Sequence, residues 1–251
     1  MTENIKIAVD AMGGENSPKK IIEGIMINHR ENSNISYNIF GDLEKIEPLL
    51  PKNYNKKIFN IVNTKNKILD TDSPLSAAKK GKDTSMWLTI QSVKNNESDV
   101  AISAGNTGAL FVISKLNLKM IKDIDKPALS ALWPNKKNFN IVLDLGLNIE
   151  CNEKNLIDFS IMGSSLFKSL YPNDNATVAL LNIGSEELKG NEVIKKAYQN
   201  LQKEINKNFD FYGYIEGNHI MDGKANVIVT DGFTGNIALK TAEGTADFII
   251  K

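Results

Sequence analysis

The sequence has a single cysteine, only two histidines and no excess of either charge. One cysteine rules out an intramolecular disulfide and a cysteine-rich zinc site, and two histidines rule out a His-rich metal centre. Thirty basic residues balance thirty acidic ones, which argues against a broad nucleic-acid-binding surface. No apolar run approaches the roughly 20 residues that span a bilayer, and no secretory signal precedes the first predicted strand, Ile5–Asp10. We therefore expect a cytoplasmic protein, since a lone cysteine also suits a reducing compartment.

Familiar motifs for nucleotide binding and nucleophilic catalysis are also missing. Neither Gly-x-Gly-x-x-Gly nor a Walker loop occurs in the chain. Cys151 is better interpreted as a small buried apolar residue than as a nucleophile. His29 falls at the end of a predicted helix and His219 in a loop, so no Ser-His-Asp arrangement is indicated.

Short β-rich runs alternate with longer amphipathic runs along all 251 residues. The predicted strands are Ile5–Asp10, Ser36–Phe40, Lys57–Val62, Asp99–Ser103, Ala128–Leu132, Asn140–Asp144, Thr177–Leu181, Phe209–Ile215 and Ala225–Thr230. The predicted helices are Lys19–Asn28, Leu43–Leu50, Ser85–Asn95, Thr107–Leu118, Glu153–Ser169, Asn191–Lys203 and a last one from Asn236. Several strands are almost entirely apolar, as parallel strands are when helices cover both faces. The pattern predicts a single α/β domain over residues 1–251, a sandwich built on a mainly parallel sheet.

Two turns in the chain repeat one another, residues 105–108 (Gly-Asn-Thr-Gly) and 232–235 (Gly-Phe-Thr-Gly). Each follows a predicted strand and opens a predicted helix. The glycines let the backbone approach a ligand closely, and free N–H groups at a helix start favour an anion. Either turn alone is compatible with ordinary punctuation between a strand and a helix. Two turns with the same residue order indicate an anion site.

Polar loops rich in small residues follow five of the predicted strands, where ligands bind in doubly wound sheets. Together they would form a pocket lined by backbone N–H groups, amides and a few charges. The residues predicted to bind substrate or phosphate are Asp10, Gly13, Gly14, Ser103, Gly105, Asn106, Thr107, Gly108, Asp144, Asn148, Asp231, Gly232, Thr234 and Gly235.

These loops suit a reaction in which the substrate supplies its own nucleophile. A phosphate oxygen that attacks an acyl carbonyl needs positioning, charge neutralisation and oxyanion donors more than it needs a base. Lys189, beside a glycine at a helix start, can neutralise charge, or it is simply a solvated lysine. Asn236, at the start of the last helix, can donate to an oxyanion, or it is a helix cap. We take both as candidate catalytic residues.

The loops as a set resemble one family, the PlsX-type phosphate acyltransferases of bacterial phospholipid synthesis. The resemblance runs from end to end in the family's order, through residues 7–14 (IAVDAMGG), 102–110 (ISAGNTGAL), 126–129 (KPAL), 158–163 (DFSIMG), 180–184 (LLNIG) and 231–236 (DGFTGN). It implies a Rossmann-like three-layer α/β/α sandwich akin to phosphotransacetylases, acting as a homodimer without a metal or redox cofactor. It also implies transfer of a long-chain acyl group from acyl carrier protein to inorganic phosphate. In the family's motifs, the catalytic lysine matches Lys189 and the essential asparagine matches Asn236.

Three features depart from the family's pattern. Glu15-Asn16 stands where Asp-His is usual, and Leu147 stands where the family has alanine. Family members also continue beyond the last helix, with a segment used for dimer contact and for peripheral contact with the inner face of the membrane. The last departure leaves open an inactive truncated fragment that binds phosphate or acyl groups. The same loop chemistry also leaves open a phosphotransacetylase acting on acyl-coenzyme A.

Overall fold

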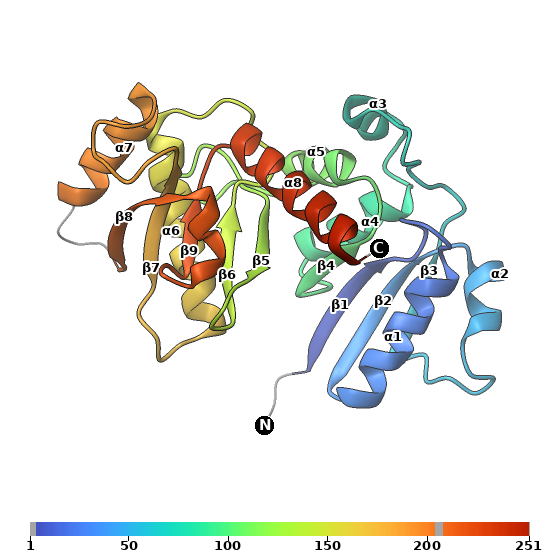
Figure 1. Cartoon of the computed structure of the whole chain (residues 1–251). Coiled ribbons are helices and arrows are strands. Elements are labelled where there is room, and N and C mark those ends of the chain that lie inside the picture. The colour runs from blue at the N-terminus through green and yellow to red at the C-terminus, as the bar shows by residue number, and fades with distance from the viewer. Residues whose placement is uncertain (1–3, 204–207, 251) are drawn as a thin grey trace. The chain divides into compact units, whose positions relative to one another are not determined.

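The computed structural model describes residues 4–203 and 208–250, and their strands form two sheets (Figure 1). The chain divides into two compact units, a first unit of Met1–Lys119 and a second unit of Met120–Lys251. The periodicity of the sequence predicts one mainly parallel sheet in a single domain, whereas the described strands form two sheets. Periodicity identifies strands but not their pairing partners, and here each unit pairs its own strands. The α/β class and the mainly parallel pairing are confirmed.

The first unit contains a four-stranded parallel sheet in the order β3-β2-β1-β4. Its strands are β1 (Ile5–Asp10), β2 (Ile35–Gly41), β3 (Phe59–Asn63) and β4 (Val100–Ser103). Its helices are α1 (Lys19–Glu31), α2 (Leu43–Ile46), the 3-10 helix η1 (Glu47–Leu49), α3 (Pro74–Lys79), α4 (Ser85–Lys94) and α5 (Thr107–Asn117). The buried face of α1, with Ile22 and Ile25, packs on Ile7 and Val9 of β1 and Ile39 of β2. This packing fixes β1, whose carboxyl end lies beside that of β4.

The second unit contains a five-stranded sheet in the order β5-β6-β9-β7-β8. Its strands are β5 (Ser130–Pro134), β6 (Phe139–Leu143), β7 (Thr177–Asn182), β8 (Asp210–Glu216) and β9 (Val227–Val229). Its helices are α6 (Glu153–Leu170), α7 (Glu192–Lys203), the 3-10 helix η2 (Gly217–Asp222) and α8 (Gly232–Ile250). Only the edge strand β5 is antiparallel to its neighbour among these described pairs.

Alternating residues of the central strands build two separate cores in the second unit. Leu143, Leu180 and Val229 pack with α6 and α7 on one face of the sheet. Their chain neighbours Val142 and Ile228 pack with α8 on the other face. The period of two in a strand therefore produces a three-layer sandwich, because each strand is apolar on both faces.

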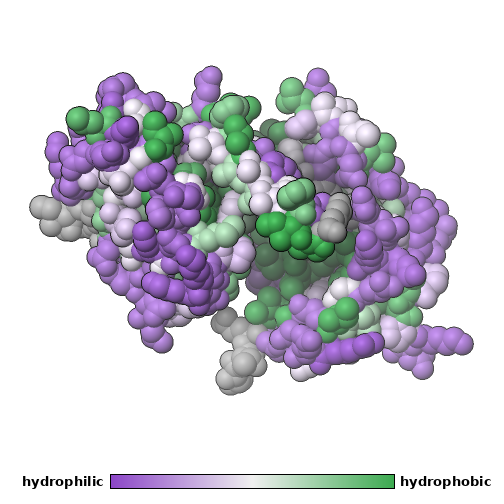
Figure 2. Space-filling model, viewed as in Figure 1, coloured by the Kyte–Doolittle hydropathy of each residue, from purple (hydrophilic) through white to green (hydrophobic). Residues whose placement is uncertain are grey.

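The end of α8 is apolar and open to solvent. Phe248, Ile249 and Ile250 are each at least 74% exposed. Figure 2 shows a group of strongly hydrophobic side chains, in green, on the visible surface. No helix within residues 4–203 and 208–250 combines the length and apolar character needed to cross a membrane.

The sequence-predicted strands and helices all overlap with observed elements. The last helix begins at Gly232 rather than Asn236, because the side chain of Asp231 accepts a hydrogen bond from Thr234 N at 2.8 Å and caps the first turn. This earlier start brings Gly235 inside the helix and against the loop that follows β6.

Two glycines of α8 allow a matched test of the contact between this helix and the loop after β6. A Cβ at Gly235 would overlap the carbonyl oxygen of Asp144, whereas a Cβ at Gly244 would meet nothing within 4 Å. We expect Gly235→Ala to lower the free energy of unfolding by ~1–3 kcal/mol through overpacking. Gly244→Ala should raise it by ~0.5–1 kcal/mol, because alanine favours a helix interior over glycine. Urea unfolding followed by circular dichroism measures both, and equal stabilities for the two variants would contradict the packing described.

Candidate functional site

The loops that follow β1 and β4 meet in the first unit, as the sequence predicts. The buried carboxylate of Asp10 accepts hydrogen bonds from Ser103 Oγ at 2.7 Å and from Met12 N at 3.2 Å. A Cβ at Gly13 would lie 2.8 Å from Gly105 N, so only glycine allows the two loops to approach this closely. The structure thus brings Asp10, Gly13, Ser103 and Gly105 together.

The start of α5 offers unpaired backbone donors. The N–H groups of Thr107 and Gly108 belong to the first helical turn, where no intrahelical carbonyl can accept from them. Asn106 is already engaged, because its Oδ1 accepts from Ala109 N and its Nδ2 donates to the carbonyls of Asp70 and Asp72, all at 3.0 Å. Asn106 therefore caps the helix and tethers a loop, while the two N–H groups stay available to an anion.

In the second unit, Asp144 organises the loop that follows β6. Its fully buried carboxylate accepts four hydrogen bonds of 2.7–3.1 Å, from Leu129 N, Leu147 N, Asn148 N and Asn148 Nδ2. Asn148 Nδ2 also donates to the carbonyl of Pro127 at 2.7 Å. Both side chains were predicted to bind substrate; the structure shows them holding the loop, and substrate contact stays a prediction.

The two Gly-x-Thr-Gly turns are not equivalent. At the start of α8, Asp231 accepts from both the N–H and the hydroxyl of Thr234, at 2.8 and 2.9 Å. Gly232 N donates to Asn148 O at 2.8 Å. This helix start therefore already holds a carboxylate, and an added anion would meet its charge. The phosphate contacts predicted for residues 231–235 stay predictions, and the start of α5 is the more open of the two.

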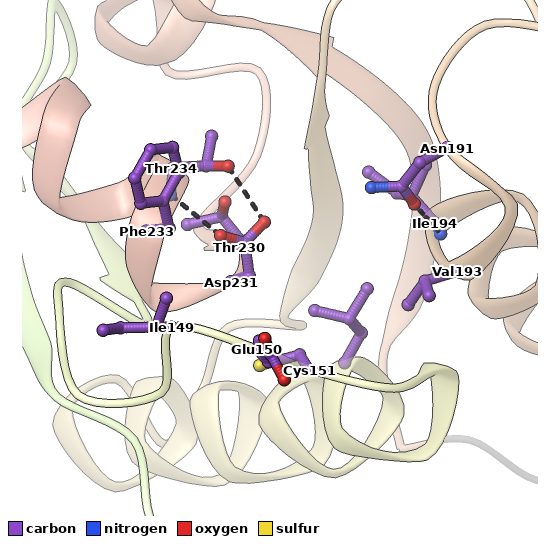
Figure 3. A pocket seen from close by; sticks show the side chains of 11 residues that line it. Ile149, Glu150, Cys151, Asn191, Val193, Ile194, Thr230, Asp231, Phe233 and Thr234 are labelled. Atoms are coloured by element: carbon purple, nitrogen blue, oxygen red, sulfur yellow. Dashed lines mark hydrogen bonds between the residues drawn. The ribbon is translucent and has the colours of Figure 1, made fainter.

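A hollow of about 340 Å³, here called the polar hollow, opens between these loops of the second unit (Figure 3). It is lined by Ile149, Glu150, Cys151, Leu156, Asn191, Val193, Ile194, Thr230, Asp231, Phe233 and Thr234. Figure 3 shows the carboxyl group of Asp231 bonded to Thr234 at one side and Asn191 at the other side. Its charged lining residues, Glu150 and Asp231, are both acidic, so the polar hollow favours a neutral ligand over a phosphate dianion.

A second hollow of about 550 Å³, here called the apolar hollow, shares Asn191, Ile194, Asp231 and Thr234 with the polar hollow. Its remaining lining residues are mainly apolar: Leu181, Asn182, Ile183, Gly190, Gly217, Ile237 and Ala238. The shared residues make the two hollows neighbouring parts of one site at the carboxyl ends of β7 and β9.

The two candidate catalytic residues flank this site. Lys189 is exposed, and its neighbour Gly190 lines the apolar hollow. Its loop is closed by bonds from Lys189 N to Glu186 O at 2.9 Å and from Asn182 Nδ2 to Lys189 O at 3.1 Å. Asn236 lies on the first turns of α8, with Nδ2 3.5 Å from Leu145 O.

Glu150, Asn191 and Ile183 are among the residues that line the hollows and were not predicted from the sequence. Asn191 directly precedes α7 in the segment after β7, and its place before a helix is the signal that would have found it. Glu150 lies two residues before the N-cap of α6, in the segment after β6. His219 lies in η2, where its Nδ1 is 2.7 Å from Asp222 Oδ2. Within the described part of the chain, no three His, Cys, Asp or Glu side chains gather as metal ligands.

Cys151 borders the polar hollow as a protonated thiol. Burial raises its pKa to about 11, and the nearby Lys126 only partly opposes this shift. A thiol with this pKa is not a nucleophile at neutral pH.

Because the chain has a single cysteine, the pKa of Cys151 can be measured by alkylation. We expect alkylation of native Cys151 by iodoacetamide to rise with a midpoint near pH 11, because only the thiolate reacts. The same chain in urea should show a midpoint of about 8.5 and serves as its own control. Circular dichroism at each pH checks that the native chain stays folded. A native midpoint at or below the unfolded one would contradict the burial described.

Known proteins share both the sequence and the fold. The chain is 68% identical to "Phosphate acyltransferase" of Pelagibacter ubique (strain HTCC1062) over 99% of its own length and 74% of that protein. It is 40% identical to "Phosphate acyltransferase" of Paramagnetospirillum magneticum (strain ATCC 700264 / AMB-1) over 98% of its length and 70% of that protein.

Among solved structures, the EutD phosphotransacetylase from Staphylococcus aureus matches with a TM-score of 0.66 and 16% identity, covering 97% of this chain and 83% of that one. A phosphotransacetylase from Streptococcus pyogenes matches with a TM-score of 0.68 and 16% identity, covering 97% and 82%. At this identity the two likenesses show the fold alone, and they confirm the expected phosphotransacetylase-like architecture. The profile of the family described as "Fatty acid synthesis protein" matches residues 5–251. The chain therefore belongs to the fatty acid synthesis protein family, that of the PlsX-type phosphate acyltransferases.

Proposed function

We propose that this chain transfers a long-chain fatty acyl group from acyl carrier protein to inorganic phosphate, giving acyl phosphate and the free carrier. The observation that carries the proposal is the 68% identity, over 99% of this chain, to a protein named phosphate acyltransferase. Acyl carrier protein as the donor, a homodimeric state and a cytoplasmic location, with peripheral contact to the inner face of the membrane, are finer parts of the proposal. They rest on the family resemblance.

The chemistry fits a site without a protein nucleophile. A phosphate oxygen attacks the thioester carbonyl carbon, a C–O bond forms, the C–S bond breaks, and the departing thiolate takes up a proton. Cys151, the only cysteine, has a pKa of about 11 and stays protonated. Direct attack by phosphate therefore needs from the protein only positioning, charge neutralisation and oxyanion donors.

Lys189 and Asn236 supply these two effects in the second unit. Within residues 4–203 and 208–250, none of the ion pairs involves Lys189, so its ammonium group is open to phosphate. Asn236 Nδ2 is 3.5 Å from Leu145 O, beyond the usual N–H···O range of about 2.7–3.2 Å. The amide nitrogen carries two N–H groups, so Asn236 can keep this long hydrogen bond and donate its other N–H to the developing oxyanion.

The acidic polar hollow takes the neutral part of the donor. The Glu150 carboxylate is a hydrogen-bond acceptor, which suits an amide N–H group next to a thioester. The side-chain oxygens of Asp231 and Asn191 already accept from Thr234 and from Ile194 N, so they contribute through their remaining lone pairs. Separately, the free N–H groups of Thr107 and Gly108 in the first unit are a second candidate phosphate contact.

Lys189→Ala tests the catalytic assignment. We expect kcat/KM for phosphate and a palmitoyl carrier-protein thioester to fall by about 10²-fold or more, as when one stabilising group is removed from a transition state. Lys196→Ala, at an exposed lysine of α7, removes the same charge and should leave turnover unchanged.

Turnover that is insensitive to Lys189→Ala would contradict the role of Lys189. Faster turnover of palmitoyl-coenzyme A than of the carrier-protein thioester would identify a phosphotransacetylase instead. No turnover by this chain, with the full-length Pelagibacter relative active in the same assay, would identify a non-catalytic fragment.

A further inference from the structure

The apolar hollow has a chemistry that the phosphate and carrier do not explain. Its apolar wall comes from three elements and the residue after one of them: Leu181 of β7 with Ile183 just after it, Ile194 of α7, and Ile237 and Ala238 of α8. A volume of about 550 Å³ is within the usual range of small-molecule sites, ~300–1,000 Å³. The lining therefore fits an apolar molecule of moderate size.

Two isoleucines on its rim are unusually open to solvent. Ile183 is 81% exposed and Ile237 is 51% exposed. An apolar ligand that covered either side chain would be bound more tightly, because the contact removes apolar surface of the isoleucine from water. Isolated exposed isoleucines need no explanation, but two on one hollow beside a polar site indicate a ligand surface.

Continuity between the two hollows restricts the ligand to an amphipathic molecule. Asn191, Ile194, Asp231 and Thr234 line both hollows, so a single ligand can place a polar neutral group in one and an apolar tail in the other. We propose that the apolar hollow binds the acyl chain of the donor thioester, with Ile183 and Ile237 setting the preference for chain length. This assignment rests on the proposed function, which supplies the acyl thioester.

The dependence of binding on the length of the acyl chain can then be measured. Each methylene group that leaves water for an apolar wall should strengthen binding by about fourfold. The gain per methylene should shrink when the two isoleucines become polar, since the tail then remains against hydrated surface.

Binding can be measured without turnover. The probes are the butanoyl, hexanoyl and octanoyl thioesters of N-acetylcysteamine, titrated by calorimetry into the whole chain in phosphate-free buffer. We expect the dissociation constant of the wild type to fall by about fourfold per methylene from butanoyl to octanoyl. In Ile183→Ser/Ile237→Ser the octanoyl probe should bind at least tenfold more weakly than in the wild type, with butanoyl binding little changed.

A matched control uses exposed apolar residues of α6 in the same unit. Ile161 and Leu170 are 43% and 47% exposed and line neither hollow. Ile161→Ser/Leu170→Ser should keep the wild-type dependence on chain length. Circular dichroism and unfolding curves of both double variants check that the fold is retained.

Three outcomes would overturn the assignment. The first is an equal gain per methylene in the wild type and Ile183→Ser/Ile237→Ser. The second is no binding of the octanoyl probe to the wild type. The third is a wild-type dimer, seen by light scattering, that dissociates in Ile183→Ser/Ile237→Ser alone, which would make the hollow a protein interface. Turnover with phosphate tests the proposed function separately. If the chain turns over substrate but shows no chain-length effect, the proposed function stands and the assignment of the apolar hollow to the acyl chain is wrong.

Discussion

The buried carboxylate of Asp144 is the constraint on which the site of the second unit depends. A carboxylate without exposure is stable only when its oxygens are satisfied, and here four N–H groups surround it. Three of the four come from Leu147 and Asn148, so the loop after β6 must fold back over its own first residue. That loop then presents Asn148 O to Gly232 N, and the backbone of Asp144 to Gly235. The position of α8, and of every residue on its first turns, follows from this arrangement.

The neighbouring parts of the site differ in charge and polarity. Glu150 and Asp231 make the polar hollow acidic, so it suits neutral donors of hydrogen bonds rather than phosphate. The apolar hollow beside it is lined by Ile183 and Ile237, whose side chains are exposed to solvent. Lys189, at the rim, is a positive charge outside the ion pairs of the described residues. In the reaction that we propose, the acyl tail is assigned to the apolar hollow, the region next to the thioester to the polar hollow, and the phosphate to Lys189.

Local sequence signals were enough to predict the strands and the longer helices, while the roles of the site residues stay predictions. Apolar runs located every described strand. The loops after β1 and β4 were predicted to belong to one pocket, and the structure brings these two loops close together at Gly13 and Gly105. The roles of two asparagines could not be predicted from local sequence. Asn106 and Asn148 look like ligand-binding amides in the sequence, yet they bond to the carbonyls of Asp70, Asp72 and Pro127, which are 21 to 36 positions away. Side-chain partners at that separation are set by folding and leave no local pattern.

The sequence by itself determined the α/β class, the order of the elements and the family, because periodicity and short motifs are properties of neighbouring residues. Only the tertiary structure decided that the strands belong to two sheets and that the two Gly-x-Thr-Gly turns differ. Both turns have the same residue order, but Asp231 turns its carboxylate back onto Thr234, while the start of α5 is capped by Asn106, which carries no charge. The physical reason is that an anion site depends on which N–H groups remain unpaired, and pairing is a property of the folded chain.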